Sequence, residues 1–319
     1  MTNGGEEVDA EEVVLSSGRW GPLAGDSIGL GPAPGAAHRG AAAVETGPPG
    51  PAGGDAVLTD VGPGPDGAGA VYGRGRSVVL LHGLTFDRAM WRPVLSRLPL
   101  GHPALALDLP GHGGSPPLDD GDHGLDSVVD AVHQAVLAAG LDRPVVVGHS
   151  LAGLFATAYG ARHPATAVVN VDQPLRVDDF ARFAQSIAPR LRGEDFAETW
   201  AVLQARMRTE NVGATYRGLL RAGDTVSQEI VLSYWAELLD LRVPDLAART
   251  DEMLARLRER GIPYVAVFGD PVDPEERGWL VERLPATEVV EWPVGHHFPH
   301  VTEASRFAAL LAGLMAARP

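Results

Sequence analysis

The ten residues from Pro144 to Gly153, PVVVGHSLAG, constrain the fold more than any other stretch of the chain. Val145 to Val147 form an unbroken β-branched run, which is typical of a strand buried on both faces. Leu154 to Arg162 follow with helical spacing, and Pro164 ends that pattern. The sequence therefore predicts a strand, a sharp turn and a helix, with Ser150 at the apex of the turn.

The tight turn explains why small residues flank the serine. Gly148 and Ala152 lie two positions before and after Ser150, where the backbone must approach itself closely. The stretch matches the nucleophile-elbow pattern G-x-S-x-G, with Ala152 in place of the last glycine. The alternative is a serine that only caps the following helix.

Composition limits the chemistry available to such a serine. The 26 basic and 41 acidic residues give a net charge of −15, so we exclude nucleic acid and anionic lipid as main partners. Cysteine is absent and every basic residue is arginine, which excludes thiol nucleophiles, cysteine metal sites, Schiff bases and Ser-Lys pairs. Catalysis must come from Ser, His, Asp and Glu, and no metal or organic cofactor is indicated.

The first part of the chain differs from the rest. Residues 1–54 are rich in Gly, Pro and Ala and read as a flexible leader. Their acidic start lacks the basic and apolar regions of a secretory signal, and no apolar run is long enough for a bilayer, so a cytoplasmic protein is expected. Gly62 to Gly67 formally match G-x-G-x-x-G, but their two prolines and the absence of a following helix argue against a dinucleotide site.

Strand and helix patterns alternate from residue 55 onward, which predicts an α/β fold with a mostly parallel sheet covered by helices on both faces. The alternation stops between Pro174 and Arg258, where helical patterns occur without strands. We therefore expect an all-helical cap inserted into one sheet domain. The predicted divisions are a leader at 1–54, a first core segment at 55–173, a cap at 174–258 and a second core segment at 259–319.

A serine hydroxyl needs a histidine to take its proton and a carboxylate to orient that histidine. Open parallel sheets place such groups at the carboxyl ends of their strands. Asp270 and Asp273 follow a predicted strand that ends at Phe268, and the histidine-rich run 295–300, GHHFPH, follows the last strand. The order Ser, Asp, His along the chain is therefore available.

Several stretches together resemble the α/β-hydrolase fold superfamily, in particular its serine hydrolases with a helical cap. The resemblance extends from about Asp55 to the C-terminus. It rests on five stretches: LLHGL (80–84), DLPGHGGS (108–115), GHSLAG (148–153), FGDPVDP (268–274) and GHHFPH (295–300). Their agreement is more specific than any single motif.

The resemblance implies a role for each matching residue. Ser150 corresponds to the nucleophile, and His297 corresponds to the base, with His296 where the family usually has glycine. Backbone N–H groups of Leu84 and Leu151 correspond to the oxyanion hole. The remaining histidines of these motifs are expected to be structural rather than metal ligands: His82, His112, His149 and His300.

The acid has three candidates. We prefer Asp273, because Asp-Pro is the usual pair at this point and Asp273-Pro274 opens a helix. Asp270 follows the strand more closely, and Asp172 is the third candidate because some relatives take the acid from the end of the preceding strand.

These features predict a serine hydrolase that acts on a small or medium, apolar ester, thioester or lactone through an acyl-enzyme. A histidine base predicts activity that falls below about pH 6.5. One alternative is a carbon–carbon hydrolase, lyase or cyclase on a natural-product-like substrate. Another is a ligand-binding receptor with a vestigial triad.

Overall fold

The computed structural model describes residues 68–70, 76–99, 102–220 and 227–316. The predicted leader lies outside these residues. Seven strands form one sheet in the order β1-β3-β2-β4-β5-β6-β7. Six of them run parallel, and β1 pairs with β3 in the antiparallel direction. The strands are β1 (Ala68–Ala70), β2 (Val78–Leu81), β3 (Ala104–Leu107), β4 (Val145–His149), β5 (Ala167–Val171), β6 (Tyr264–Phe268) and β7 (Glu288–Glu291).

The inner strands are buried on both faces. Along β2, Val78 and Leu80 belong to one hydrophobic core, whereas Val79 and Leu81 belong to the other. Successive side chains of a strand point to opposite faces, so unbroken apolar strands require helices on both sides of the sheet. The α/β fold predicted from the sequence is confirmed.

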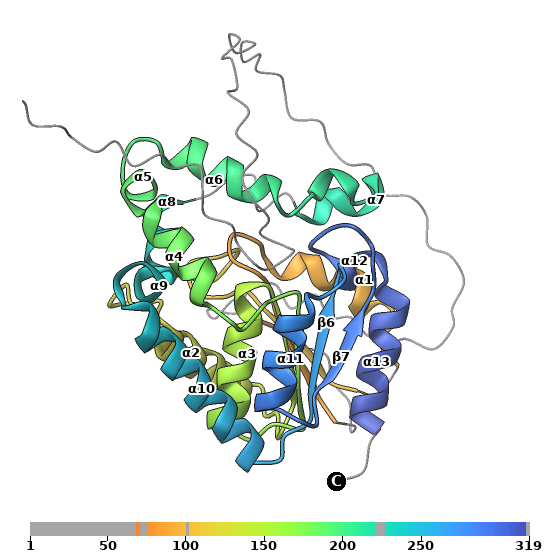
Figure 1. Ribbon diagram of the computed structural model, residues 1–319. Coiled ribbons are helices and arrows are strands. Elements are labelled where there is room, and N and C mark those ends of the chain that lie inside the picture. Colours follow the sequence, from red (N-terminus) through yellow and green to blue (C-terminus); the bar gives the residue numbers. More distant parts are fainter. Residues whose placement is uncertain (1–67, 71–75, 100–101, 221–226, 317–319) are drawn as a thin grey trace, which may run out of the picture.

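Helices supply both layers, as Figure 1 shows. On one face pack α2 (Leu125–Ala138), α3 (Leu151–Arg162), α10 (Val243–Glu259) and α11 (Pro274–Arg283), whose buried apolar side chains share a core with Val79 and Leu81. On the other face lie the 3₁₀ turn η1 (Arg88–Trp91), α1 (Arg92–Leu95), α12 (Pro299–Thr302) and α13 (Ala304–Ala316).

A helical segment separates β5 from β6, and none of its described residues forms a strand. Figure 1 shows α5, α6 and α7 across one end of the sheet. Before α10, the described elements of this segment are α4 (Asp178–Ser186), α5 (Ala188–Arg192), α6 (Phe196–Ala205), η2 (Thr209–Asn211), α7 (Ala214–Arg217), α8 (Gln228–Tyr234) and α9 (Ala236–Asp240). The predicted cap also includes α10, yet this helix packs beside α3, where Leu257 lies next to Gly160. We propose that the cap comprises α4 to α9.

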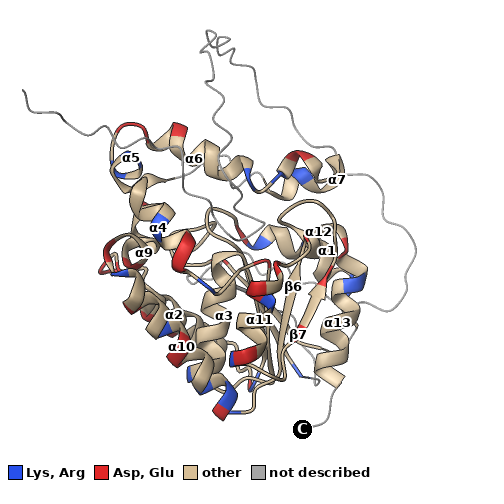
Figure 2. Cartoon of the chain, viewed as in Figure 1, with Lys and Arg blue, Asp and Glu red and all other residues tan. Residues whose placement is uncertain are grey.

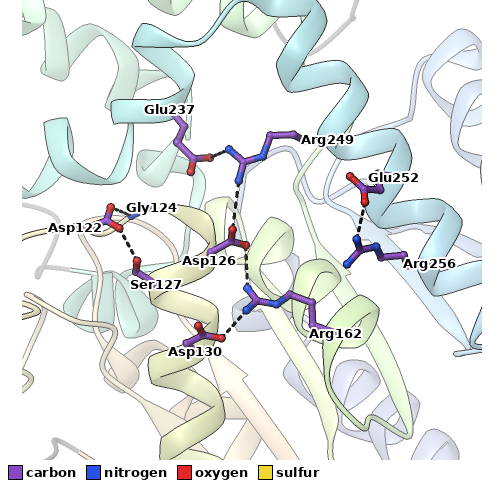
Figure 3. Close-up of polar contacts among 10 residues, drawn as sticks. All are labelled: Asp122, Gly124, Asp126, Ser127, Asp130, Arg162, Glu237, Arg249, Glu252 and Arg256. Atoms are coloured by element: carbon purple, nitrogen blue, oxygen red, sulfur yellow. Dashed lines mark hydrogen bonds and ion pairs between the residues drawn. The ribbon is translucent and has the colours of Figure 1, made fainter.

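Ion pairs join the end of this segment to the sheet domain. Both signs of charge lie along α10 (Figure 2). Figure 3 shows Arg249 of α10 between Glu237 of α9, at 2.9 Å, and Asp126 of α2, at 3.6 Å. Arg162 of α3 binds the same Asp126 at 2.9 Å. Partly exposed pairs contribute at most about 1 kcal/mol each, so this network orients helices more than it stabilises them.

The buried histidines predict a loss of stability in mild acid. Burial lowers the pKa of His82 and His112 to about 4 and that of His300 to about 3. Below the unfolded value of about 6.5, the unfolded chain binds protons that the folded chain does not. The free energy of unfolding should therefore fall as pH drops from about 6.5 toward 4, by about 1.4 kcal/mol per pH unit for each such histidine.

Urea unfolding at several pH values checks this expectation. The His300→Leu variant is a matched control, because neither ring nitrogen of His300 has a hydrogen-bond partner among the described residues. It should unfold with a gentler pH dependence than the wild type. A free energy of unfolding that stays constant between pH 7 and pH 5 would contradict the prediction.

Candidate active site

Ser150 stands at the turn between β4 and α3 in a strained backbone conformation, with φ 55° and ψ −134°. Two backbone hydrogen bonds hold the turn. Ser150 N–H donates to the Val171 carbonyl oxygen at 2.8 Å, and Gly153 N–H donates to the Ser150 carbonyl oxygen at 2.6 Å. A Cβ atom on Gly148 would lie 1.8 Å from the Ala152 carbonyl oxygen, so only glycine fits there. Strain of this kind persists only when its surroundings enforce it, and it is typical of functional positions.

His297 and Asp172 form the hydrogen-bonded pair of the site. Nδ1 of His297 donates to Oδ2 of Asp172 at 2.6 Å. Oδ1 of Asp172 accepts from Gly269 N–H at 2.7 Å, and the residue is 2% exposed. The carboxylate thus fixes the imidazole tautomer and leaves Nε2 as the basic nitrogen. Because Ser150 and His297 line the same cavity, the structure brings together a hydroxyl, an imidazole and a carboxylate.

The structure does not bring Asp273, the preferred candidate for the acid, to His297. Asp273 caps α11, and its Oδ1 accepts from Glu275 N–H at 2.7 Å rather than from the imidazole. Asp270 pairs with Arg208, which lies between α6 and η2. Asp172, the third candidate, is the aspartate whose carboxylate accepts the bond from His297. Its signal in the sequence was its place directly after β5, the strand that neighbours the serine strand.

The predicted structural histidines order loops around the serine. Nδ1 of His82 donates to Gly83 at 2.8 Å, and its Nε2 accepts from Leu109 N–H at 2.9 Å. Nδ1 of His112 donates to the Pro110 carbonyl oxygen at 3.0 Å, and its Nε2 accepts from Thr85 N–H at 3.1 Å. These bonds join the LLHGL loop to the DLPGHGGS loop.

His149 and His296 hold the histidine loop. Nε2 of His149 donates to the carbonyl oxygen of His297 at 2.8 Å, and burial lowers the pKa of His149, so it stays neutral. Nδ1 of His296 accepts from Phe298 N–H at 3.1 Å. His296 therefore folds back onto its own loop, and the residue that meets Asp172 is His297. No group of three or more metal-ligating side chains occurs in the part of the chain that the structure describes.

The cap is bonded to the same loop, a feature that the sequence did not indicate. His297 N–H donates to the Met207 carbonyl at 3.1 Å, and the Asn211 amide donates to Gly295 at 3.0 Å. The pair between Arg208 and Asp270 joins this stretch to the end of β6. The cap is thus hydrogen-bonded to the backbone of His297, the candidate base.

A cavity of about 200 Å³ lies between the cap and the sheet. Ser150, His297 and the predicted oxyanion residues Leu84 and Leu151 line it. Charged residues also line it, among them Arg206, Asp273 and Glu276. Most of the wall is apolar, and its large side chains come from α3, the cap and α10: Leu154, Phe155, Phe180, Trp200, Leu203, Tyr234, Trp235, Leu238 and Met253. Gly83 brings the LLHGL loop against the serine, because a Cβ atom there would lie 3.1 Å from Ser150 Cβ.

This fold and site belong to a recognised class of proteins. The sequence profile of the alpha/beta hydrolase family matches residues 78–310. Pimeloyl-acyl-carrier protein methyl ester esterase of Chromobacterium violaceum is 30% identical over 261 residues, which are 75% of this chain and 94% of the relative. The chain belongs to the alpha/beta hydrolase family, and it is a hydrolase enzyme.

A second curated relative and two solved structures are also similar to the chain, the latter two in fold. A putative carbamate hydrolase RutD of Shigella flexneri is 27% identical and covers 73% of this chain and 89% of its own length. A thermophilic esterase from Thermogutta terrifontis matches with a TM-score of 0.64 at 19% identity, over 78% of this chain and 93% of that one. A hydrolase from Oleispira antarctica has the same TM-score at 16% identity, over 80% of this chain and 96% of that one. Among the described residues, no helix is both long and apolar enough to cross a membrane.

Proposed function

We propose that the enzyme is a serine hydrolase that cleaves small or medium neutral esters, thioesters or lactones through an acyl-enzyme. The observation that carries the proposal is the bond of 2.6 Å between His297 Nδ1 and Asp172 Oδ2, in a cavity that the strained Ser150 also lines. Ester hydrolysis agrees with the activity named for the relative from Chromobacterium violaceum.

In the first step, Ser150 Oγ attacks the substrate carbonyl carbon while His297 Nε2 takes the hydroxyl proton. Asp172 stabilises the imidazolium, and the backbone N–H groups of Leu84 and Leu151 face the developing oxyanion. His297 then returns the proton to the leaving alcohol, and the acyl group stays on Ser150. Water attacks the acyl-enzyme with His297 as base, which releases the acid and restores the serine.

The cavity wall supports a substrate whose acyl or alcohol part is apolar and uncharged. Apolar side chains form most of the wall, and two of the arginines that line it are paired with acids. Arg249 binds Glu237 at 2.9 Å, and Arg176 binds Glu275 at 3.4 Å. A substrate carboxylate would have to displace these partners, whereas an aliphatic or aromatic group needs only to displace water.

Intact-mass analysis after treatment with a serine-directed fluorophosphonate tests the proposal. The wild type should gain one adduct, and Ser150→Ala should gain none, because labelling needs an activated serine. Labelling of Ser150→Ala, or a folded wild type that resists the reagent, would overturn the assignment. A p-nitrophenyl series then tests the substrate class, with butyrate expected to exceed the monosuccinate ester in kcat/KM.

A further inference from the structure

We propose that Asn170 is a positioning residue that holds Asp172 in the conformation needed to orient His297, and this rests on the triad of the proposed function. Asn170 lies on β5, two residues before Asp172, and is 1% exposed. It does not line the cavity, so it has no contact with a substrate there. Its role must be explained by its contacts inside the protein.

Asp172 needs such support because of its backbone. Its φ of 62° lies in the left-handed region, which an aspartate adopts only in a turn that favours it. One side of the turn is fixed by β6, since Asp172 N–H donates to the Val267 carbonyl at 2.8 Å. This bond fixes the backbone N–H of Asp172, but it does not fix the direction that the backbone takes after Asp172.

The Asn170 side chain fixes that direction. Its Nδ2 donates to the carbonyl oxygen of Gln173 at 2.7 Å, and its Oδ1 accepts from Gln173 N–H at 3.2 Å. One amide thus satisfies both backbone groups of the residue that follows Asp172, and we call this pair of bonds the Asn170–Gln173 clamp.

The elbow motif contains a glycine that makes room for the clamp. A Cβ atom on Gly153 would lie 2.4 Å from Asn170 Oδ1 and 2.8 Å from Gln173 Cβ. Gly148 and Ala152 meet each other across the serine turn, whereas Gly153 faces β5. The N–H of the last glycine of GHSLAG therefore holds the serine turn, whereas its lack of a side chain makes room for the acid turn.

The clamp acts on the reaction through Asp172. With the turn fixed, Asp172 accepts from Gly269 N–H with one oxygen and from His297 with the other. If the turn shifts by about an ångström, the carboxylate no longer matches both donors, and misplacements of this size cost about a hundredfold in rate. The protonated imidazole then loses part of its stabilisation.

Steady-state kinetics of Asn170→Ala across pH tests the proposal. We expect kcat to fall about 10- to 100-fold, with a smaller change in KM, because Asn170 lies outside the cavity wall and is bonded to that wall through Gln173. The acidic limb of kcat/KM should move to lower pH, because the imidazolium is less stabilised. Gly153→Ala, which keeps Asn170 but displaces its amide, should show the same shift, and it replaces Asn170→Ala if that variant does not fold.

Two further variants separate this role from a general loss of packing. Val169→Ala removes buried methyl groups from the neighbouring position of β5, on the opposite face of the sheet, and keeps both bonds of the clamp. It should leave the pH profile unchanged. In an Asp172→Ala background, Asn170→Ala should lower kcat by less than about twofold. The carboxylate that Asn170 positions is already absent there, so the two effects do not add.

The outcomes distinguish the clamp from the triad. Full activity of Asp172→Asn would overturn the triad and the clamp with it. A second outcome is that Asp172→Asn is impaired while Asn170→Ala and Gly153→Ala both keep the wild-type pH profile. This outcome would overturn the role of the clamp and leave the triad in place. A full additional loss from Asn170→Ala in the Asp172→Ala background would show that Asn170 acts independently of Asp172, which also contradicts the proposal.

Discussion

Asp172→Asn is expected to lower kcat about 10³- to 10⁴-fold. The physical reason lies in the two bonds of the carboxylate. Gly269 N–H needs an acceptor, so the oxygen of an asparagine would remain there and its NH₂ group would face His297 Nδ1. The imidazole would then have to carry its proton on Nε2, which points a donor at the serine hydroxyl that needs a base.

Asp273→Asn is the matched control, because it makes the same chemical change in the residue preferred on sequence grounds. Asparagine caps a helix as well as aspartate does, so α11 should keep its N-terminus. Ester hydrolysis should stay within about threefold of the wild type. Loss of activity in Asp273→Asn with full activity in Asp172→Asn would reverse our assignment of the acid.

Gly148→Ala is expected to have the largest effect on stability. The new methyl group would lie 1.8 Å from the Ala152 carbonyl oxygen and 2.3 Å from its carbon. These are backbone atoms of the first turn of α3, so no side-chain rotation can relieve the overlap. We expect the free energy of unfolding to fall by about 3 kcal/mol or more, with a melting temperature lower by roughly 6–12 °C.

Gly278→Ala provides the comparison. Gly278 lies inside α11, and a Cβ atom added there would have no atom within 4 Å, so the same substitution should be neutral or stabilising by up to about 1 kcal/mol. Differential scanning calorimetry of the two variants measures the difference. A Gly148→Ala protein that melts like the wild type and still reacts with fluorophosphonate would contradict the steric account of the turn.

Much of the fold could be predicted from local patterns. Val145 to Val147, the turn at Ser150 and the following helix are adjacent in the sequence, and the forces that shape them act between neighbours. The helical segment between β5 and β6 was visible as an interruption of the strand pattern. The boundary that we propose for the cap was less visible, because α10 is helical like the cap but packs beside α3.

The candidate site was harder to predict where it depends on distant contacts. Asp172 and His297 are 125 residues apart, and Asn170 has no motif that marks it. The attachment of Met207 and Asn211 to the histidine loop also joins segments that no local pattern relates.

The sequence by itself determined the parallel sheet, the serine turn and the order of the serine, aspartates and histidines after the strands. Hydrophobic periodicity and the small residues of a tight turn shape the backbone through neighbouring residues, so local patterns reveal them. Only the tertiary structure decided which of three aspartates meets His297. That choice depends on the direction in which each strand-end turn points its side chain. At Asp172 the direction follows from a φ of 62° and its bonded neighbours on β5 and β6, whereas Asp273 is held by the helix that it caps.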